Sequence, residues 1–87
     1  SVYRPARVAL AAKQLELIAK NTNTKQPEGY ELARQAQYTA AEYYAKDKDM
    51  EAARLALRTY AHNYPKPFDM AQEVRLKMAE FYNERVI

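Results

Sequence analysis

The side chains that could take part in catalysis are few, and their spacing does not form an active site. His62 is the single histidine, and with no cysteine in the chain it has no second soft ligand with which to hold a metal ion. The only serine is Ser1, so a Ser-His-Asp arrangement is not expected, and the single glycine, Gly29, cannot form a glycine-rich phosphate loop. Asp47 and Asp49 are better explained as helix caps than as an acid and a base. We therefore expect a protein that is not an enzyme and that needs no cofactor.

Charged and aromatic residues indicate a binding surface instead. In the segment 28–46, five residues fall on one face of a helix because they recur at steps of three and four, namely Glu31, Gln35, Tyr38, Glu42 and Lys46. The segment 68–86 carries a corresponding set, which consists of Asp69, Glu73, Leu76, Glu80 and Glu84. Together these two sets, which we call the acidic strip, would suit a basic or amphipathic peptide, with Tyr38 and Leu76 as apolar anchors. The alternative is an ordinary solvated helix face.

A second charged surface is predicted on the segment 49–63. Arg54, Arg58 and His62 recur at four-residue spacing, and Lys66 follows just beyond. This basic ridge could contact an acidic partner or phosphate groups. It could equally serve solubility alone, since exposed ion pairs contribute little free energy.

The charge distribution leaves nucleic acid as an alternative partner. The net charge is +3, and the first 25 residues hold five basic side chains against Glu16 alone. A basic helical module would contact phosphates through Arg4, Arg7, Lys13 and Lys20, together with Arg54 and Arg58. The remainder of the chain is close to neutral, which is weaker than the basic patch of a dedicated nucleic-acid binder. A protein partner or peptide is therefore the favoured expectation.

The elements that must position these residues are predicted to be four helices in one domain, residues 1–87. Apolar residues recur at helical spacing in the segments 5–20, 28–46, 49–63 and 68–86, and the prolines stand at the segment boundaries. The predicted inward faces include Ile18 in the first segment and Tyr82 in the last. Alanine-rich helices with eight tyrosines can pack closely, and the short connections imply antiparallel neighbours. The fold class is thus all-α, built from antiparallel helix pairs.

An internal repeat relates the two halves of the chain. A shift of 38 residues places Pro27 on Pro65, Tyr30 on Phe68 and Tyr38 on Leu76, and it brings the residues 41–44 onto 79–82. Repeats of this period are typical of stacked helical arrays. The phase of the repeat leaves a half-repeat at each end, so the helices either form part of an open stack or close on themselves as a four-helix bundle.

Residues 34–67 resemble the tetratricopeptide repeat, a family of helical pairs that stack with a right-handed twist and bind peptides. Ala41 and Tyr44 occupy the small and aromatic positions of its first helix, Ala53 and Leu57 match the second helix, and Pro65 matches the closing proline. The Tyr64-Pro65 ending is similar to that of the variant repeats in bacterial envelope lipoproteins. The departures are Gln37, Ala40 and Tyr60, which stand where the family prefers tryptophan, leucine and alanine. The resemblance implies a non-enzymatic scaffold module within a larger assembly.

Location and oligomeric state are less constrained. A chain without cysteine is compatible with the cytoplasm or the periplasm, and no apolar run reaches the roughly 18 residues that a membrane span requires. Exposed end helices would also allow self-association.

Overall fold

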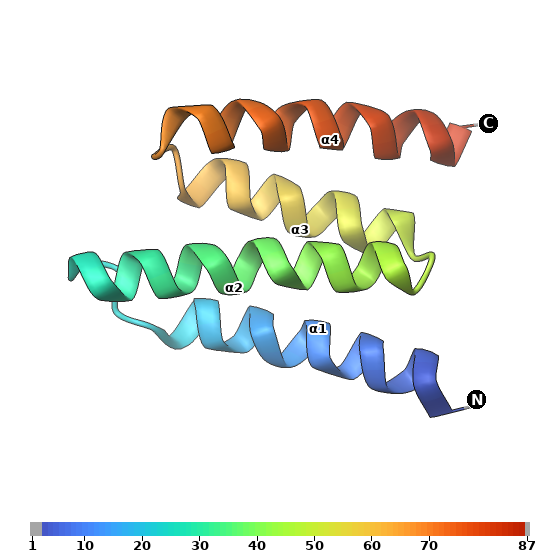
Figure 1. Ribbon diagram of the computed structural model, residues 1–87, viewed down its shortest axis with the longest axis horizontal. Coiled ribbons are helices and arrows are strands. Elements are labelled where there is room, and N and C mark those ends of the chain that lie inside the picture. The colour runs from blue at the N-terminus through green and yellow to red at the C-terminus, as the bar shows by residue number, and fades with distance from the viewer. Residues whose placement is uncertain (1–2, 87) are drawn as a thin grey trace.

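The computed structural model contains four α-helices in the positions that the sequence predicts (Figure 1). It describes the backbone of residues 3–86 and the side chains of residues 7–83. The helices are α1 (Tyr3–Asn21), α2 (Pro27–Lys46), α3 (Met50–Asn63) and α4 (Phe68–Val86). The predicted boundaries are therefore confirmed to within two residues, and the all-α fold class is confirmed.

Local sequence signals explain where the helices begin and end. Pro27 is the first residue of α2, where its missing N–H costs no hydrogen bond. The Asp49 side chain accepts a hydrogen bond from the backbone N–H of Ala52 at 3.0 Å and so caps α3, as predicted. Asp69 lies inside the first turn of α4, and its carboxylate accepts a hydrogen bond from the neighbouring N–H of Met70.

The helices pack in the order of the sequence and form an open row. Substantial interfaces join α1 to α2, α2 to α3 and α3 to α4, and no interface of similar extent joins α1 to α4 among the described residues. Figure 1 shows α1 and α4 at opposite edges of the row, with each helix antiparallel to the next. The Cα positions extend over 39 × 28 × 14 Å, which describes a thin slab. The closed four-helix bundle is therefore not the arrangement of this chain.

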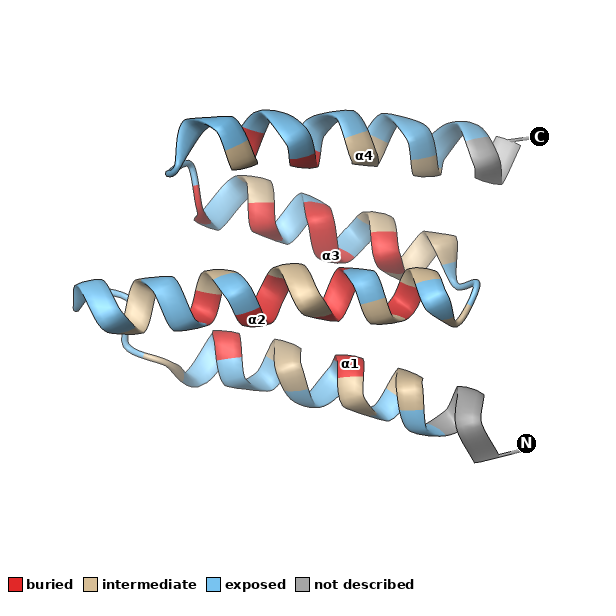
Figure 2. Ribbon diagram, in the orientation of Figure 1, coloured by how far each residue is buried: buried red, intermediate tan, exposed pale blue. Residues whose placement is uncertain are grey.

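Alanine and tyrosine form most of the core. Figure 2 shows that the buried positions are concentrated along α2 and α3. Ala33, Ala40 and Ala53 are fully buried and let the helix backbones approach one another. Tyrosine rings then fill the α2–α3 interface in a continuous series, in which neighbouring ring centroids lie 5.4 to 5.9 Å apart and no pair stacks face to face. Each such pair contributes about 0.5–1.5 kcal/mol beyond its buried area. The series consists of Tyr30, Tyr64, Tyr60 and Tyr38.

Two predicted core residues are exposed instead. Ile18 in α1 and Tyr82 in α4 were expected to face inward, but their exposed fractions are 45% and 50%. Both lie on the end helices, which are covered by a neighbour on one side only. Helical spacing identifies an apolar stripe, but it does not tell how much of that stripe a neighbouring helix covers.

No helix among the described residues combines the length and the apolar character that crossing a bilayer requires.

Candidate partner-binding groove

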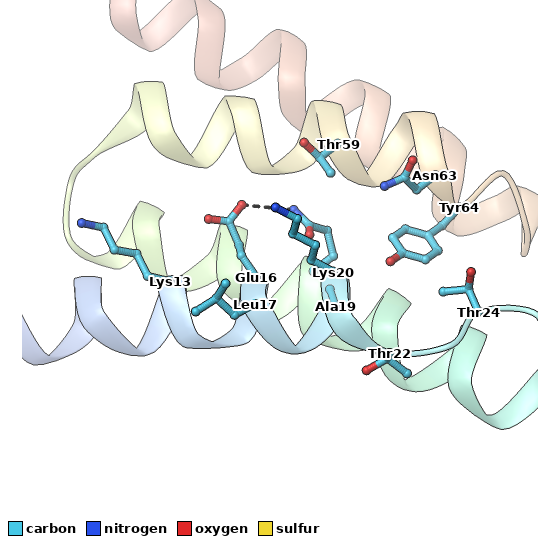
Figure 3. A pocket seen from close by; sticks show the side chains of 11 residues that line it. Lys13, Glu16, Leu17, Ala19, Lys20, Thr22, Thr24, Thr59, Asn63 and Tyr64 are labelled. Carbon is cyan, nitrogen blue, oxygen red and sulfur yellow. Dashed lines mark hydrogen bonds between the residues drawn. The ribbon is translucent and has the colours of Figure 1, made fainter.

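An open groove of about 820 Å³ lies between α1 and α3. Figure 3 shows its two walls: α1 contributes Lys13, Leu17 and Lys20, whereas α3 contributes Thr59 and Asn63. The α1–α2 loop closes one end through Thr22 and Thr24, and α2 forms the floor. We call this surface the α1–α3 groove. Its volume falls within the range of small-molecule and peptide sites.

The floor of the groove is held by a network of polar side chains that joins three helices. Gln37 is only 3% exposed, and its Nε2 donates to the backbone oxygen of Ala56 at 2.9 Å and to Glu16 Oε2 at 3.4 Å. The Tyr44 hydroxyl donates to Glu16 Oε1 at 2.7 Å. Burial, and then this hydrogen bond, raise the pKa of Tyr44 above its usual range. The Glu16 carboxylate therefore serves the α1–α2 interface, and it leaves one negative charge in the groove between the two lysines of the α1 wall.

The walls of the groove are basic on one side and neutral on the other. Lys13 and Lys20 are exposed, and neither forms an ion pair within the described part of the chain. They are seven residues apart in one helix, which separates them by roughly 10 Å along the axis. Thr59 and Asn63 on the opposite wall offer hydrogen-bonding groups without charge. Leu17 and Tyr64 supply apolar surface.

The absence of a side chain at Gly29 allows the loop that closes the groove to lie against α2. A Cβ atom at this position would lie 1.9 Å from the backbone oxygen of Asn23 and 3.4 Å from Cγ2 of Thr22. The loop therefore lies directly against the first turn of α2. Gly29 is therefore required for this close approach.

The residues of the predicted acidic strip lie in several different environments. Glu31 is exposed, but it accepts hydrogen bonds from Arg34 and Gln35 on its own helix. The hydrogen bond from the Arg34 guanidinium, followed by that from Gln35, lowers the pKa of Glu31 to about 2. Much of the charge of Glu31 is thus compensated locally. Arg34 also donates to the Tyr60 hydroxyl at 2.8 Å and so ties this pair to α3.

Tyr38 and Glu42 are brought together with Lys77 of α4. Tyr38 is half-buried against the Tyr60 ring, and Lys77 Nζ lies 5.5 Å from the Tyr38 ring centroid. The Tyr38 side chain, chiefly through hydrogen bonding, raises the pKa of Lys77. The cavity at this point, which Phe81 also lines, measures only about 20 Å³. Tyr38 is therefore a packing residue as well as a surface residue.

The remaining strip residues lie apart from this cluster. Lys46 Nζ lies 5.6 Å from the Tyr43 ring centroid and lines a separate hollow with Arg7 of α1. Leu76 and Glu80 are exposed on α4, as are Asp69 and Glu73. The Glu84 side chain lies outside the described residues, as does that of Arg4. The peptide-binding role of the strip remains a prediction.

The predicted basic ridge is not uniformly exposed. Arg54 is half-buried, its guanidinium pairs with Glu51 at 3.3 Å, and its buried Nε has no hydrogen-bond partner in the described structure. Arg58 and His62 are exposed, as is Lys66, whose backbone oxygen accepts from the Tyr30 hydroxyl. Only part of this ridge is therefore free for a partner.

Sequence reasoning did not identify the α1–α3 groove. Lys13 and Lys20 were noted only for their positive charge, while Thr59 and Asn63 carry no signal that sets them apart from other polar surface residues. The side chains on its two walls are about 40 residues apart in the chain, so only the packing of α2 brings them together.

Within the described part of the chain, no cluster of histidine and acidic residues could hold a metal ion. The chain matches no protein-family model, no curated protein and no solved structure. The resemblance to the tetratricopeptide repeat therefore remains a prediction.

Proposed function

We propose that this protein is a non-enzymatic interaction module, and that the α1–α3 groove binds an extended, acidic segment of a partner protein. The observation that carries the proposal is the groove itself, an open cleft of about 820 Å³ with two lysines on one wall that form no ion pair with any described residue. Carboxylate side chains of a partner would pair with Lys13 and Lys20, while the polar side chains of α3 and of the loop would position its backbone.

An extended segment suits the groove better than a helix does. Thr59, Asn63 and Thr24 present hydrogen-bonding groups, which an extended backbone can use because its N–H and C=O groups are free. A bound helix satisfies its backbone groups internally, so it would leave the hydrogen-bonding groups of Thr59, Asn63 and Thr24 without backbone partners.

The spacing of the lysines indicates the spacing of the acidic residues. Lys13 and Lys20 are separated by roughly 10 Å along α1. In a polyproline II segment, residues three apart point the same way and are about 9 Å apart. We therefore expect the best ligand to carry two Asp or Glu residues separated by two others.

Nucleic acid is the alternative that the same lysines support, together with the exposed Arg7, Lys25 and Arg58. Phosphate-dominated binding would depend steeply on salt and little on the arrangement of carboxylates. A peptide partner is favoured because Arg54 pairs with Glu51 and because the lysines face a groove lined with neutral hydrogen-bonding groups.

The test is a fluorescence anisotropy titration with three labelled probes: an acidic peptide with the expected spacing, a scrambled peptide of the same composition, and a single-stranded oligonucleotide. The double variant Lys13→Glu/Lys20→Glu should weaken binding of the first peptide by about tenfold or more, since two ion pairs are replaced by repulsion. Lys48→Glu is a control, because Lys48 is exposed in the α2–α3 turn and does not line the groove. The double variant Lys48→Glu/Lys66→Glu is a second control, because it changes the net charge by the same amount as the groove variant.

The outcomes separate the candidates. Loss of binding in the groove variant with retention in both controls supports the proposal. Equal loss in the groove variant and in the matched double control would show unspecific charge attraction and contradict it. Tighter binding of the oligonucleotide than of either peptide at moderate salt would support the nucleic-acid alternative instead.

A further inference from the structure

The two edges of the helix row expose apolar surface that no other helix covers. Six of the eight large hydrophobic side chains that are exposed lie on the end helices. In arrays of helical repeats, a terminal helix normally carries a polar outer face, because the repeats inside the array bury theirs against a neighbour. The six residues are Leu10, Leu17 and Ile18 on α1, and Phe68, Leu76 and Tyr82 on α4.

The outer face of α4 corresponds to the face that α2 packs against α3. The 38-residue repeat places Tyr30 on Phe68 and Tyr38 on Leu76. Tyr30 and Tyr38 contact tyrosine rings of α3 at centroid distances of 5.4 and 5.9 Å. Their counterparts on α4 contact no further helix, and their exposed fractions are 64% and 67%. The third member of this face, Ala41, is buried in α2, whereas its counterpart Ala79 is exposed.

In the 38-residue repeat, the outer face of α1 corresponds to the face of α3 that packs against α2. The same shift places Ile18 on Ala56, which is 1% exposed and whose backbone oxygen accepts the hydrogen bond from Gln37 of α2. Ile18 is 45% exposed. One chain thus carries at one end the α4 half of an interface that it already forms internally, and at the other end part of the second half, since Tyr60 and Tyr64 correspond to Thr22 and Gln26 under the same shift.

Charge also favours the meeting of unlike ends. The exposed charged residues in the described part of α1 are Arg7, Lys13 and Lys20, all of them positive. Arg7 lies on the same side of the helix as Ile18, whereas Lys13 and Lys20 line the α1–α3 groove and contribute only to the overall charge of the helix. On α4 the exposed charged residues are Asp69, Glu73 and Glu80 against Arg75 alone. Two copies of α1 would repel each other, and so would two copies of α4, whereas α4 and α1 attract.

We infer that α4 of one copy packs against α1 of a second copy, in an arrangement that repeats the α2–α3 packing and joins copies head to tail. Such a contact is heterologous, so it can add further copies in the same direction. A single helix pair buries less than the about 1,600 Å² of a standard interface. We therefore expect a weak association that is observed at protein concentrations approaching the millimolar range.

Two variants test the polarity of this contact. Leu76→Lys places a positive charge on the outer face of α4, and Ile18→Glu places a negative charge on the outer face of α1. Neither residue lines the α1–α3 groove, so peptide binding should be unchanged in both variants. Leu55→Lys is the matched control, because Leu55 is 44% exposed but lies on the internal helix α3.

The measurement is sedimentation equilibrium at protein concentrations up to about 1 mM, with helicity checked by circular dichroism. We expect the unchanged protein and Leu55→Lys to associate, and each end variant alone to stay monomeric. An equimolar mixture of the two end variants should associate again, because one supplies an intact α1 and the other an intact α4.

Three results would overturn the inference. Self-association of Ile18→Glu alone would indicate an α4–α4 contact, and self-association of Leu76→Lys alone would indicate an α1–α1 contact. An unchanged protein that stays monomeric over the whole range would show that a second copy does not cover these faces. If an end variant loses helicity, it can be replaced by a variant at an exposed position of the same face. Ala79→Lys then replaces Leu76→Lys on α4, and Gln14→Glu replaces Ile18→Glu on α1.

Discussion

Replacing Gly29 by alanine should destabilise the protein, although helix propensity alone predicts the opposite. Gly29 is the third residue of α2, and alanine is favoured over glycine by up to about 1 kcal/mol within a helix. The added Cβ, however, would lie 1.9 Å from the backbone oxygen of Asn23 and 3.0 Å from its carbonyl carbon. A carbon and an oxygen normally approach no closer than about 3.3 Å, so the loop would have to move by roughly 1.4 Å.

The loop cannot make this movement without losing contacts. Asn23 Oδ1 accepts a hydrogen bond from the backbone N–H of Lys25 at 3.0 Å, and the neighbouring Thr22 hydroxyl donates to the backbone oxygen of Ile18. Overpacking of this kind costs about 1–3 kcal/mol, and a lost hydrogen bond costs about 1 kcal/mol. After subtraction of the propensity gain, the free energy of unfolding should fall by about 1–3 kcal/mol. For a chain of this length, the melting temperature then falls by roughly 5–25 °C.

Thermal and urea unfolding followed by circular dichroism would measure the effect. Ala79→Gly in α4 is a control, since Ala79 is exposed and its replacement should cost only the propensity difference of about 1 kcal/mol. If Gly29→Ala raises the melting temperature while Ala79→Gly lowers it, propensity outweighs the steric contact, and the packing described for this loop is wrong.

Three further predictions follow from the hydrogen bonds and pKa values. Tyr44→Phe should lower the free energy of unfolding by about 1 kcal/mol, whereas Tyr43→Phe, which removes a hydroxyl without a hydrogen bond in the described structure, should have little effect in the same urea titration. An NMR titration should give Glu31 a pKa of about 2, and Arg34→Met should return this pKa toward its usual value of 4.5. The stabilisation from the Glu31–Arg34 pair is present above pH 4.5 and is lost as the pH falls through 2. Burial raises the pKa values of Tyr44 and Tyr64, so their contribution to stability is complete below a pH of about 10 and is lost as the pH rises through the folded-state values. Urea midpoints should therefore fall as the pH rises above about 10, and they should stay constant there if these rings are not buried.

The helices and their boundaries could be predicted because the signals that set them are local. Pro27 begins α2 and Asp49 caps α3 through interactions within a few residues of the chain, so neighbouring sequence is sufficient to identify them. The inward faces of the two central helices were also predictable. A helix with neighbours on both sides buries a wide stripe, and periodic apolar residues such as Ala40 and Leu57 mark it directly.

The end helices show where this reasoning stops. Ile18 and Tyr82 have the same spacing as core residues, yet they are exposed because the row is open and nothing in the described structure covers its outer sides. Whether four amphipathic helices close into a bundle or remain in a row depends on the relative free energies of whole packings. That balance is not encoded in the period of any one helix.

The candidate groove was decided by tertiary structure alone. Lys20 and Asn63 face one cleft only because α2 lies between their helices, and Gln37 becomes a buried link because Glu16 and the Ala56 carbonyl both come within reach of one side chain. Similarly, the need for glycine at position 29 comes from the backbone carbonyl of Asn23, and no local sequence pattern indicates this contact. Composition and spacing determine which residues form helices and which faces are apolar, since these depend on short-range geometry. Contacts between residues distant in the chain require the folded arrangement, because they depend on how the helices are placed against one another.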